Sequence, residues 1–228
     1  MANLGKILSR HNKIDLDSVM VIGLGRFGSA VADELISHGV DVLGIDTSTR
    51  IIQEHRIQLT EAIVADTTET ETLVQLGALN FDKVVIGIGS NLEASILTAS
   101  NLVELGAKDI WAKADSNAHA RILSQVGVHH VVRPERETGR RVAHLLAGKF
   151  QEFAEFDNDY GMIKMVPPKF LRIQRVDNGY LIQKYGVHIV SARVNGVWGP
   201  VQPGATLTKD DLVILAGKPT KLEQIPAQ

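Results

Sequence analysis

The sequence predicts an α/β protein, with a doubly wound parallel sheet followed by a small α+β domain. From residue 19 to residue 132, short apolar runs alternate with helical patterns, which is typical of a parallel sheet covered by helices. A glycine-rich turn joins the first apolar run to the first helical pattern. Beyond residue 159 the alternation stops, and short strands separated by turns follow. These three observations predict two domains of different architecture.

The most specific motif lies between residues 19 and 46. The apolar run Val19–Ile22 is followed by the glycine turn 23–28, by a helical pattern, and by a second apolar run, Val42–Ile45, which ends at Asp46. A strand, a glycine turn of the type G-x-G-x-x-G, a helix, a strand and an acidic residue form the fingerprint of a dinucleotide-binding, Rossmann-like unit. A chance glycine turn in an α/β domain remains the alternative.

Each glycine of this turn has its own expected role. Gly23 allows the tight turn, Gly25 lets the backbone approach a phosphate, and Gly28 lets the helix pack close to the strand. The free N–H groups at the start of the helix favour an anion. Asp46 is placed to accept both hydroxyls of an adenosine ribose, and its charge disfavours a 2′-phosphate. We therefore expect NAD in preference to NADP.

The alternation then continues in order. Helices are predicted over Arg50–Leu59, Glu69–Leu76, Asn91–Leu105 (with Asn91 as its cap) and Ala118–Val126, and strands over Ala62–Ala65, Lys83–Ile88, Asp109–Lys113 and His129–Val132. Ligands bind such sheets at the carboxyl ends of the strands. The candidate cofactor-binding residues at this edge are Gly23, Gly25, Arg26, Phe27, Gly28, Asp46, Thr47, Asp66, Thr67, Gly87, Ile88, Gly89, Asn91 and Lys113.

Charged residues at this edge suggest phosphate recognition. Arg26 lies inside the glycine turn, where a guanidinium can hold phosphate oxygens in a bidentate way, although a surface arginine is the alternative. Lys113 ends a buried strand, where a phosphate or carboxylate partner is expected. Asp66 and Thr67 follow the third strand, a usual place for contacts to adenine, but turn chemistry explains them almost as well.

After the last strand of the sheet, Pro134 is expected to start a helix over Glu135–Phe150. Its apolar residues Val142, Leu145, Leu146 and Phe150 form a face that can stay outside the sheet, and the acidic run Asp157-Asn158-Asp159 is taken as a boundary. The predicted strands beyond it are Met162–Val166, Gly186–Val194, Gly196–Pro200 and Asp211–Leu215, with Asn195-Gly196 as a hairpin signal. The predicted division is a tail 1–17, a nucleotide-binding domain 18–134, a crossover helix 135–152 and a C-terminal domain 153–228.

Composition excludes several classes of function. The chain has 228 residues, a net charge of −2 and no cysteine, so nothing favours nucleic acid as a partner, and disulfides and cysteine-bound metals are excluded. We expect no membrane span, because no apolar run approaches the length of a spanning helix. The first thirteen residues carry basic side chains without the apolar core of a signal peptide, and a solvated tail is expected there in preference to a docking tail.

The sequence gives little support for a catalytic site. The pattern Tyr160-x-x-x-Lys164 matches the catalytic pair of short-chain dehydrogenases, but that pair needs a helix, and here a strand is predicted. His129 and His130 are neighbours on a predicted strand, so their side chains face opposite sides and a structural role is expected. No Ser-His-Asp arrangement is evident. An NAD-dependent oxidoreductase would also need a proton-transfer group at the binding edge, and none is placed there.

Four stretches together resemble one family. They are GLGRFG, IDTSTR, VIGIGSNLEASILTASNLVELG and IWAKADSNAHARILSQVGVHHVVRPERETGRRVA. With the small C-terminal domain, they resemble the RCK (KTN) proteins, and more narrowly the KtrA/TrkA-type cytoplasmic subunits that gate bacterial potassium uptake systems. The combination is more specific than the glycine motif alone. One nucleotide-binding unit and one C-terminal unit resemble the KtrA type, in contrast to the duplicated TrkA type.

This resemblance implies a regulatory protein, not an enzyme. It implies a ring of subunits, commonly eight, in the cytoplasm under a membrane potassium-translocating partner of the KtrB/TrkH kind, with a helix that crosses between subunits. ATP and ADP, or NADH and NAD, would favour different ring shapes. Asp46 would hold the ribose, Arg26 the outer phosphates, partly from the neighbour, and Lys113 would assist. Glu135 would coordinate a divalent or monovalent cation at the dimer interface, whereas its position in the first turn of the predicted helix alone favours a helix-start acid.

The C-terminal domain of relatives often binds cyclic di-AMP between two subunits. Those relatives carry an arginine just before a tyrosine-glycine strand, whereas this sequence reads Ile182-Gln183-Lys184-Tyr185-Gly186. The missing arginine weakens the expectation of cyclic di-AMP binding. A stand-alone nucleotide sensor without a membrane partner would keep every site named above and remains an alternative.

Overall fold

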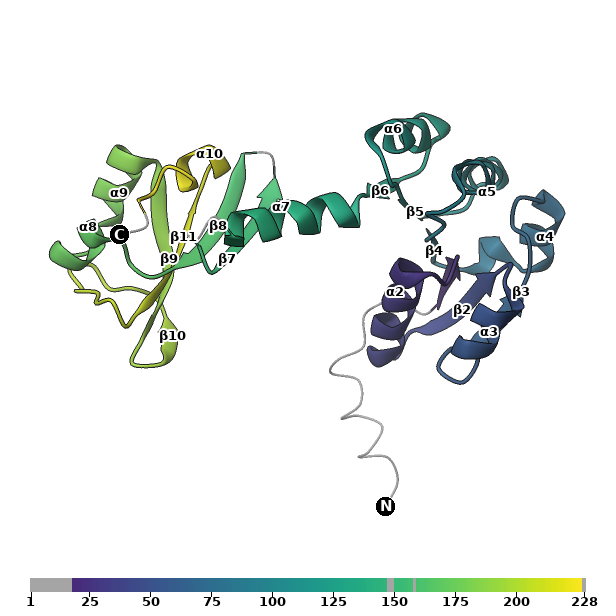
Figure 1. Ribbon diagram of the computed structural model, residues 1–228, viewed down its shortest axis with the longest axis horizontal. Coiled ribbons are helices and arrows are strands. Elements are labelled where there is room, and N and C mark those ends of the chain that lie inside the picture. Colours follow the sequence, from purple (N-terminus) through teal and green to yellow (C-terminus); the bar gives the residue numbers. More distant parts are fainter. Residues whose placement is uncertain (1–17, 147–149, 158, 227–228) are drawn as a thin grey trace, which may run out of the picture. The chain divides into compact units, whose positions relative to one another are not determined.

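The computed structural model describes residues 18–146, 150–157 and 159–226 (Figure 1). The chain divides into two compact units, of which the first ends at Pro134 and the second begins at Glu135. Among the described residues, none of the helices combines the length and the apolar character that crossing a bilayer requires. The predicted N-terminal tail, 1–17, lies outside the described residues.

The first unit contains a six-stranded sheet in which every strand pair is parallel. Its strands follow the order β3-β2-β1-β4-β5-β6. This order reverses direction between β1 and β4, and in such sheets ligands bind beyond the carboxyl ends of the strands at this switch point. The predicted fold class is confirmed. The strands are β1 (Ser18–Ile22), β2 (Asp41–Asp46), β3 (Glu61–Val64), β4 (Lys83–Ile86), β5 (Ile110–Lys113) and β6 (His130–Val132).

Helices cover both faces of this sheet. They are α2 (Arg26–Ser37), α3 (Thr49–His55), α4 (Thr70–Gln75), α5 (Leu92–Leu105) and α6 (Asn117–Val126), with a short 3-10 turn η2 (Ala78–Asn80). Successive residues of a strand point to opposite faces. Val19 and Val21 of β1 therefore share a core with residues of α2 and α3, whereas Met20 and Ile22 share a second core with residues of α4, α5 and α6.

Polar caps fix where these helices begin. Asn91 precedes α5 and its side chain accepts the N–H of Ala94 at 3.0 Å, so the predicted cap is confirmed. Ser48 and Ser116 cap α3 and α6 in the same way. Helix α3 ends at His55 instead of the predicted Leu59. The N–H groups of residues 58 and 59 both bond to the carbonyl of His55, which closes a turn and places Leu59 in the core.

The second unit contains a five-stranded antiparallel sheet with the order β10-β9-β11-β8-β7. The Asn195-Gly196 hairpin is confirmed, since both residues have the positive φ that a tight turn between β9 and β10 requires. The elements are α7 (Pro134–Leu146), which begins at the end of the first unit, β7 (Glu152–Asp157), β8 (Tyr160–Met165), α8 (Lys169–Ile173), α9 (Asn178–Tyr185), β9 (Val187–Val194), β10 (Val197–Gly199), β11 (Leu212–Gly217) and α10 (Pro219–Leu222).

Two predictions near residue 150 were wrong. Phe150 was assigned to the apolar face of the crossover helix, but α7 ends at Leu146, and Phe150 is buried in the core of the second unit. The acidic run 157–159 was taken as a boundary, but strands β7 and β8 pair across it. Strand β7 was missed because it is an edge strand with a shift of register. Of its two phenylalanines only Phe153 is buried, so no alternation of apolar residues is visible.

Candidate functional site

The glycine loop lies at the carboxyl end of β1 and is closed by backbone packing. Gly23 has a φ of 86° and donates its N–H to the carbonyl of Ile45 at 2.7 Å. A Cβ on Gly28 would overlap with the carbonyl oxygen of Gly23, and a Cβ on Gly87 would lie 2.7 Å from the same atom. Three glycines therefore bring the start of α2, the loop and the segment after β4 into direct contact.

The start of α2 is open. Gly25 is its N-cap, so no side chain caps the helix, and its first turn contains no acidic residue. A Cβ on Gly25 would meet no described atom within 4 Å. The uncapped N–H groups and the positive end of the helix dipole therefore face a space that an anion can fill, which is the arrangement that phosphate groups require.

Asp46 connects the end of β2 to this loop. One carboxylate oxygen accepts the N–H of Leu24 at 2.9 Å, and the other accepts the N–H of Ser48 at 2.8 Å. Each carboxylate oxygen can accept more than one hydrogen bond. The side chain is thus held against the glycine loop and can still accept ribose hydroxyls.

Lys113 ends β5, the neighbour of β4. Its side chain is 12% exposed, and its Nζ lies 3.0 Å from Oδ1 of Asp115. A Cβ on Gly89 would lie 3.0 Å from this Nζ. The predicted phosphate-binding lysine is therefore close to the glycine-rich segment 87–89 and is paired with a carboxylate of its own chain.

Other candidates contribute in more limited ways. Thr67 is buried and its hydroxyl forms a 2.9 Å hydrogen bond with that of Thr98, so its side chain is directed into the unit. Asp66 is exposed, and hydrogen bonds from the backbone and then the side chain of Thr68 lower its pKa. Asn91 uses its side chain to cap α5.

The remaining candidates lie on the outside of the loop or away from it. Arg26 is exposed at the first position of α2, Thr47 is exposed after β2, and Phe27 packs partly into the core. Ile88 packs against Gly23, and its side chain would lie 3.1 Å from a Cβ on Gly23. Glu135 is exposed in the first turn of α7 and belongs to the second unit. The described residues contain no group of three histidine, aspartate or glutamate side chains that could hold a metal.

The sequence analysis missed a buried histidine close to this edge of the sheet. His119 on α6 is 2% exposed, and its Nδ1 accepts the N–H of Asp115 at 3.4 Å. Burial lowers the pKa of His119, and the charge of Asp115 offsets this only in part. Nε2 of His119 and Oγ of Ser95, both buried, have no hydrogen-bond partner among the residues that the structure describes. The signal for His119 is its position on the same helix face as Leu123, one turn later.

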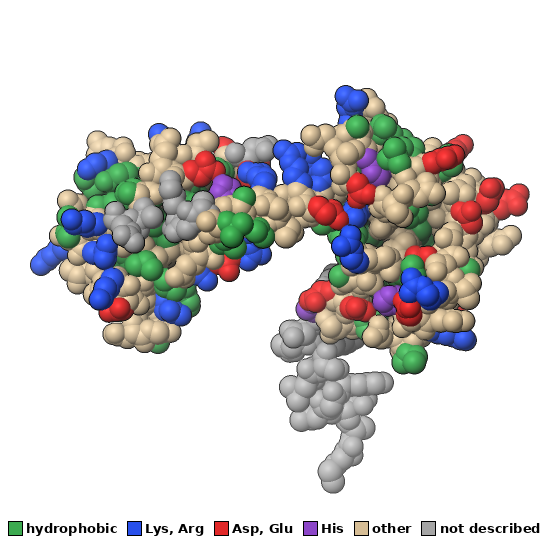
Figure 2. Space-filling model, in the orientation of Figure 1, with side chains coloured by type: hydrophobic (Ala, Val, Ile, Leu, Met, Phe, Trp, Pro, Cys, Tyr) green, Lys and Arg blue, Asp and Glu red, His purple; other side chains and the backbone are tan. Residues whose placement is uncertain are grey.

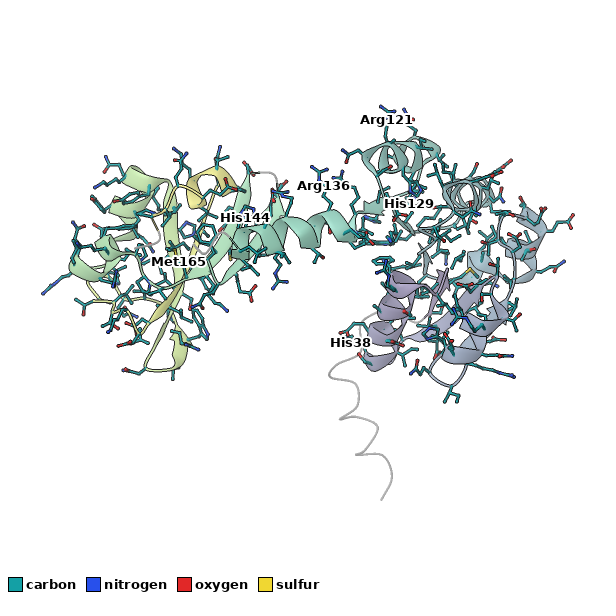
Figure 3. All side chains as sticks on the ribbon, in the orientation of Figure 1. His38, Arg121, His129, Arg136, His144 and Met165 are labelled. Carbon is teal, nitrogen blue, oxygen red and sulfur yellow. The ribbon has the colours of Figure 1, made fainter. Side chains whose placement is uncertain are left out.

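The catalytic alternatives find no support in the placement of their residues. Tyr160 and Lys164 both lie on β8, as predicted, where residues four apart are separated by roughly 13 Å along the strand. His129, labelled in Figure 3, accepts the N–H of Ile110 at 3.0 Å. His130 stacks on Trp111 with ring centroids 4.1 Å apart. Both histidines make structural contacts, as predicted.

Comparisons with known proteins show which family this chain is similar to. The family model for the TrkA-N domain matches residues 19–134. The Ktr system potassium uptake protein C of Bacillus subtilis is 33% identical over 207 residues, which cover 90% of this chain and 93% of that protein. The Ktr system potassium uptake protein A of Vibrio alginolyticus is 34% identical over 204 residues, which cover 89% of this chain and 93% of that protein.

Among solved structures, the GsuK channel bound to NAD is similar in fold, with a TM-score of 0.63 at 16% identity. The match covers 96% of this chain and 41% of the GsuK chain. At this identity the likeness shows the fold alone.

Proposed function

This chain belongs to the TrkA-N family, and from this membership we infer that it is a regulatory subunit of a potassium uptake system that senses adenine nucleotides. In each of the two alignments with a Ktr potassium uptake protein, about nine-tenths of this chain and about nine-tenths of the relative are covered. That extent of alignment includes the C-terminal unit as well as the nucleotide-binding unit, which is why we propose the role of a whole regulatory subunit.

The observation that carries the proposal is the juxtaposition of the open start of α2 with the carboxylate of Asp46. The first favours phosphate and the second favours a ribose with free hydroxyls. ATP, ADP and NAD(H) share both groups, whereas NADP carries a 2′-phosphate that Asp46 repels. A protein named as the GsuK channel bound to NAD has this fold, which supports the choice of ligand class.

We propose binding, not catalysis, as the output of the site. An oxidoreductase needs a proton-transfer group beside the reacting ring, whereas the candidate acids and bases at this edge are engaged in backbone and ion-pair contacts. A ligand shifts a conformational equilibrium only through its different affinity for the two states. The γ-phosphate of ATP, next to Arg26, is the difference that can separate ATP from ADP.

The exposed apolar side chains of α7 support an assembly of several copies. Helix α7 has no buried residue in the single chain, and its apolar residues Val142 and Leu146 are 45% and 82% exposed. Hydrophobic side chains also reach the surface of the C-terminal unit (Figure 2). We propose that a second copy of the chain covers α7, within a ring of up to eight subunits on the cytoplasmic face of a membrane potassium-translocating subunit. Glu135 would meet a cation at the interface between copies.

Light scattering tests the assembly. The protein should form dimers or larger rings at micromolar concentration, and Leu146→Ser should shift it toward monomers. Ile57→Ser, which removes a side chain that is 96% exposed on the first unit, is the matched control and should leave the assembly unchanged. A wild-type protein that stays monomeric with and without nucleotide would contradict the ring.

Co-purification with a potassium-translocating membrane subunit tests the function. In vesicles that contain both proteins, ATP and ADP should give different potassium fluxes. The second candidate function, a stand-alone sensor, has the same nucleotide site and is favoured if nucleotide binds with the expected preference while no membrane subunit is retained. Failure to bind any adenine nucleotide would contradict both.

A further inference from the structure

An ion pair occupies the part of the binding edge where Lys113 is expected to meet phosphate. Lys113 is the last residue of β5, and its Nζ lies 3.0 Å from Oδ1 of Asp115, two residues later. The lysine side chain is 12% exposed and that of the aspartate is 42% exposed. The cation is therefore mostly enclosed, while its anionic partner is more exposed to solvent.

Both charged groups lie over Gly89. A Cβ at this position would lie 3.0 Å from Nζ of Lys113, 3.1 Å from Oδ2 of Asp115 and 3.2 Å from its Oδ1. The same segment contacts the glycine loop, since a Cβ on Gly23 would lie 3.0 Å from the N atom of Ile88. The ion pair is thus placed beside the loop that is expected to hold the phosphates, within the same compact unit.

The backbone at Asp115 is fixed. Its N–H donates to Nδ1 of the buried His119, and the hydroxyl of Ser116 accepts the N–H of His119 at 3.0 Å, which caps α6. A carboxylate on a fixed backbone stays near Lys113, whereas one on a mobile loop would drift away. The pairing is therefore a built feature of the strand-to-helix turn.

We propose that Asp115 is an internal competitor for Lys113, a carboxylate that an incoming phosphate group must displace. The proposal rests on the proposed function, because it concerns the same nucleotide site. A paired lysine presents little net charge to a ligand, so Lys113 contributes to binding only when a phosphate competes with the carboxylate. Asp115 would then lower the affinity for adenine nucleotides in general and most strongly for those that carry the most phosphate charge.

The expected effect follows from the exposure of the pair. The Lys113 side chain is 12% exposed and that of Asp115 is 42% exposed, and a charge pair that is open to solvent on one side changes affinity by about two- to fivefold. Asp115→Asn should therefore tighten ATP binding by about two- to fivefold. The gain should be smaller for ADP and smallest for AMP, and it should shrink as the salt concentration rises, because salt screens exposed charges.

A titration series by calorimetry, with the full chain and magnesium-free ATP, ADP and AMP, tests this order. Asp41→Asn is the matched control. It makes the same change of net charge at the opposite end of a strand of the same sheet, since Asp41 begins β2 and Asp46 ends it. It should leave all three affinities unchanged. Asp115→Gln, checked by circular dichroism for its fold, provides a second variant.

A double-mutant cycle separates competition from simple repulsion. If Asp115 acts by occupying Lys113, then Lys113→Met should weaken ATP binding more in the Asp115→Asn background than in the wild type. Equal losses in the two backgrounds would overturn the proposal, and so would weaker ATP binding by both Asp115 variants, which would mean that the carboxylate positions the lysine. A wild type that binds ATP with no gain in either variant overturns this inference alone, whereas a wild type that binds no nucleotide overturns the proposed function with it.

Discussion

The carboxylate of Asp46 accepts the backbone N–H of Leu24 at 2.9 Å, which joins the end of β2 to the middle of the glycine loop. The residue expected to recognise the ribose is therefore also part of the support of the loop. A change at Asp46 acts on both, and a test of ribose recognition has to separate the two effects.

Two variants of Asp46 make this separation. Asp46→Ala removes both the loop contact and the ribose acceptor, and it should weaken binding of ATP and NADH by ~1–3 kcal/mol. Asp46→Asn keeps one oxygen, which can accept the N–H of Leu24, but it removes the charge and the acceptor for the N–H of Ser48. The preference for NADH over NADPH should therefore narrow, and the melting temperature should fall less than in Asp46→Ala, because the loop contact is kept. Calorimetry that shows equal affinity of the wild type for NADH and NADPH would contradict the assignment.

Gly28 and Gly25 should give opposite results when replaced by alanine. A Cβ on Gly28 would overlap with the carbonyl oxygen of Gly23, so Gly28→Ala forces α2 away from the loop and should lower the free energy of unfolding by ~1–3 kcal/mol. A Cβ on Gly25 meets no described atom within 4 Å, and this residue has an ordinary φ of −66°. Gly25→Ala should therefore unfold like the wild type but bind nucleotide more weakly. A stable Gly28→Ala protein, measured by denaturant unfolding, would contradict the packing argument.

The glycine loop and the sheet could be predicted because their signals are local. Gly23, Gly28 and Asp46 lie within one strand-helix-strand unit, and the spacing of these residues reflects contacts between neighbours in the chain. The wrong prediction for Phe150 and the failure to predict strand β7 have another origin. The burial of Phe150 and Phe153 depends on β8 and β11, which come later in the chain, and an edge strand shows no regular alternation.

Local sequence patterns also could not predict which side chains contact the candidate binding residues. Lys113 was expected to meet a phosphate or a carboxylate, but the choice of Asp115 as its partner and the position of both over Gly89 depend on how β5 lies beside the segment that follows β4. The hydroxyl of Thr67 was expected at the edge and instead bonds to Thr98 of α5, thirty-one positions away. Sequence spacing predicts which strand ends meet, whereas the direction of each side chain depends on packing.

His119 should make stability depend on pH. Burial lowers its pKa, so the folded protein takes up this proton less readily than the unfolded chain, whose histidines titrate near pH ~6.5. The stabilisation is complete above that pH and is lost as the pH falls from about 6.5 toward the lower pKa of the folded state. His119→Asn keeps an acceptor for the N–H of Asp115 and does not titrate. The decrease in the free energy of unfolding between pH ~7.5 and pH ~5.5, measured by urea unfolding, should therefore be smaller in this variant than in the wild type. An equal decrease in the two proteins would contradict this prediction.

Arg26 is expected to sense the terminal phosphate. Its guanidinium is exposed at the first position of α2, beside the open helix start, and forms no hydrogen bond or ion pair that is seen among the described residues. Asp46 and the glycine loop are expected to contact groups that ATP and ADP share, so they should set affinity without discriminating. Arg26→Ala should cost ~1.5–3 kcal/mol for ATP and less for ADP, because hydrogen bonds between charged groups are the strong ones.

The fold and ADP binding should survive this change, while the ratio of ATP to ADP affinity falls. Arg50→Ala is the matched control, since Arg50 is an exposed arginine of α3 that pairs with Glu54 on its own helix. It should leave the ratio unchanged. In vesicles that contain the membrane subunit, potassium flux with the Arg26→Ala protein should no longer differ between ATP and ADP. If that protein kept the full ATP preference in binding and in flux, the γ-phosphate would be recognised by another residue, and the open start of α2 would serve affinity alone.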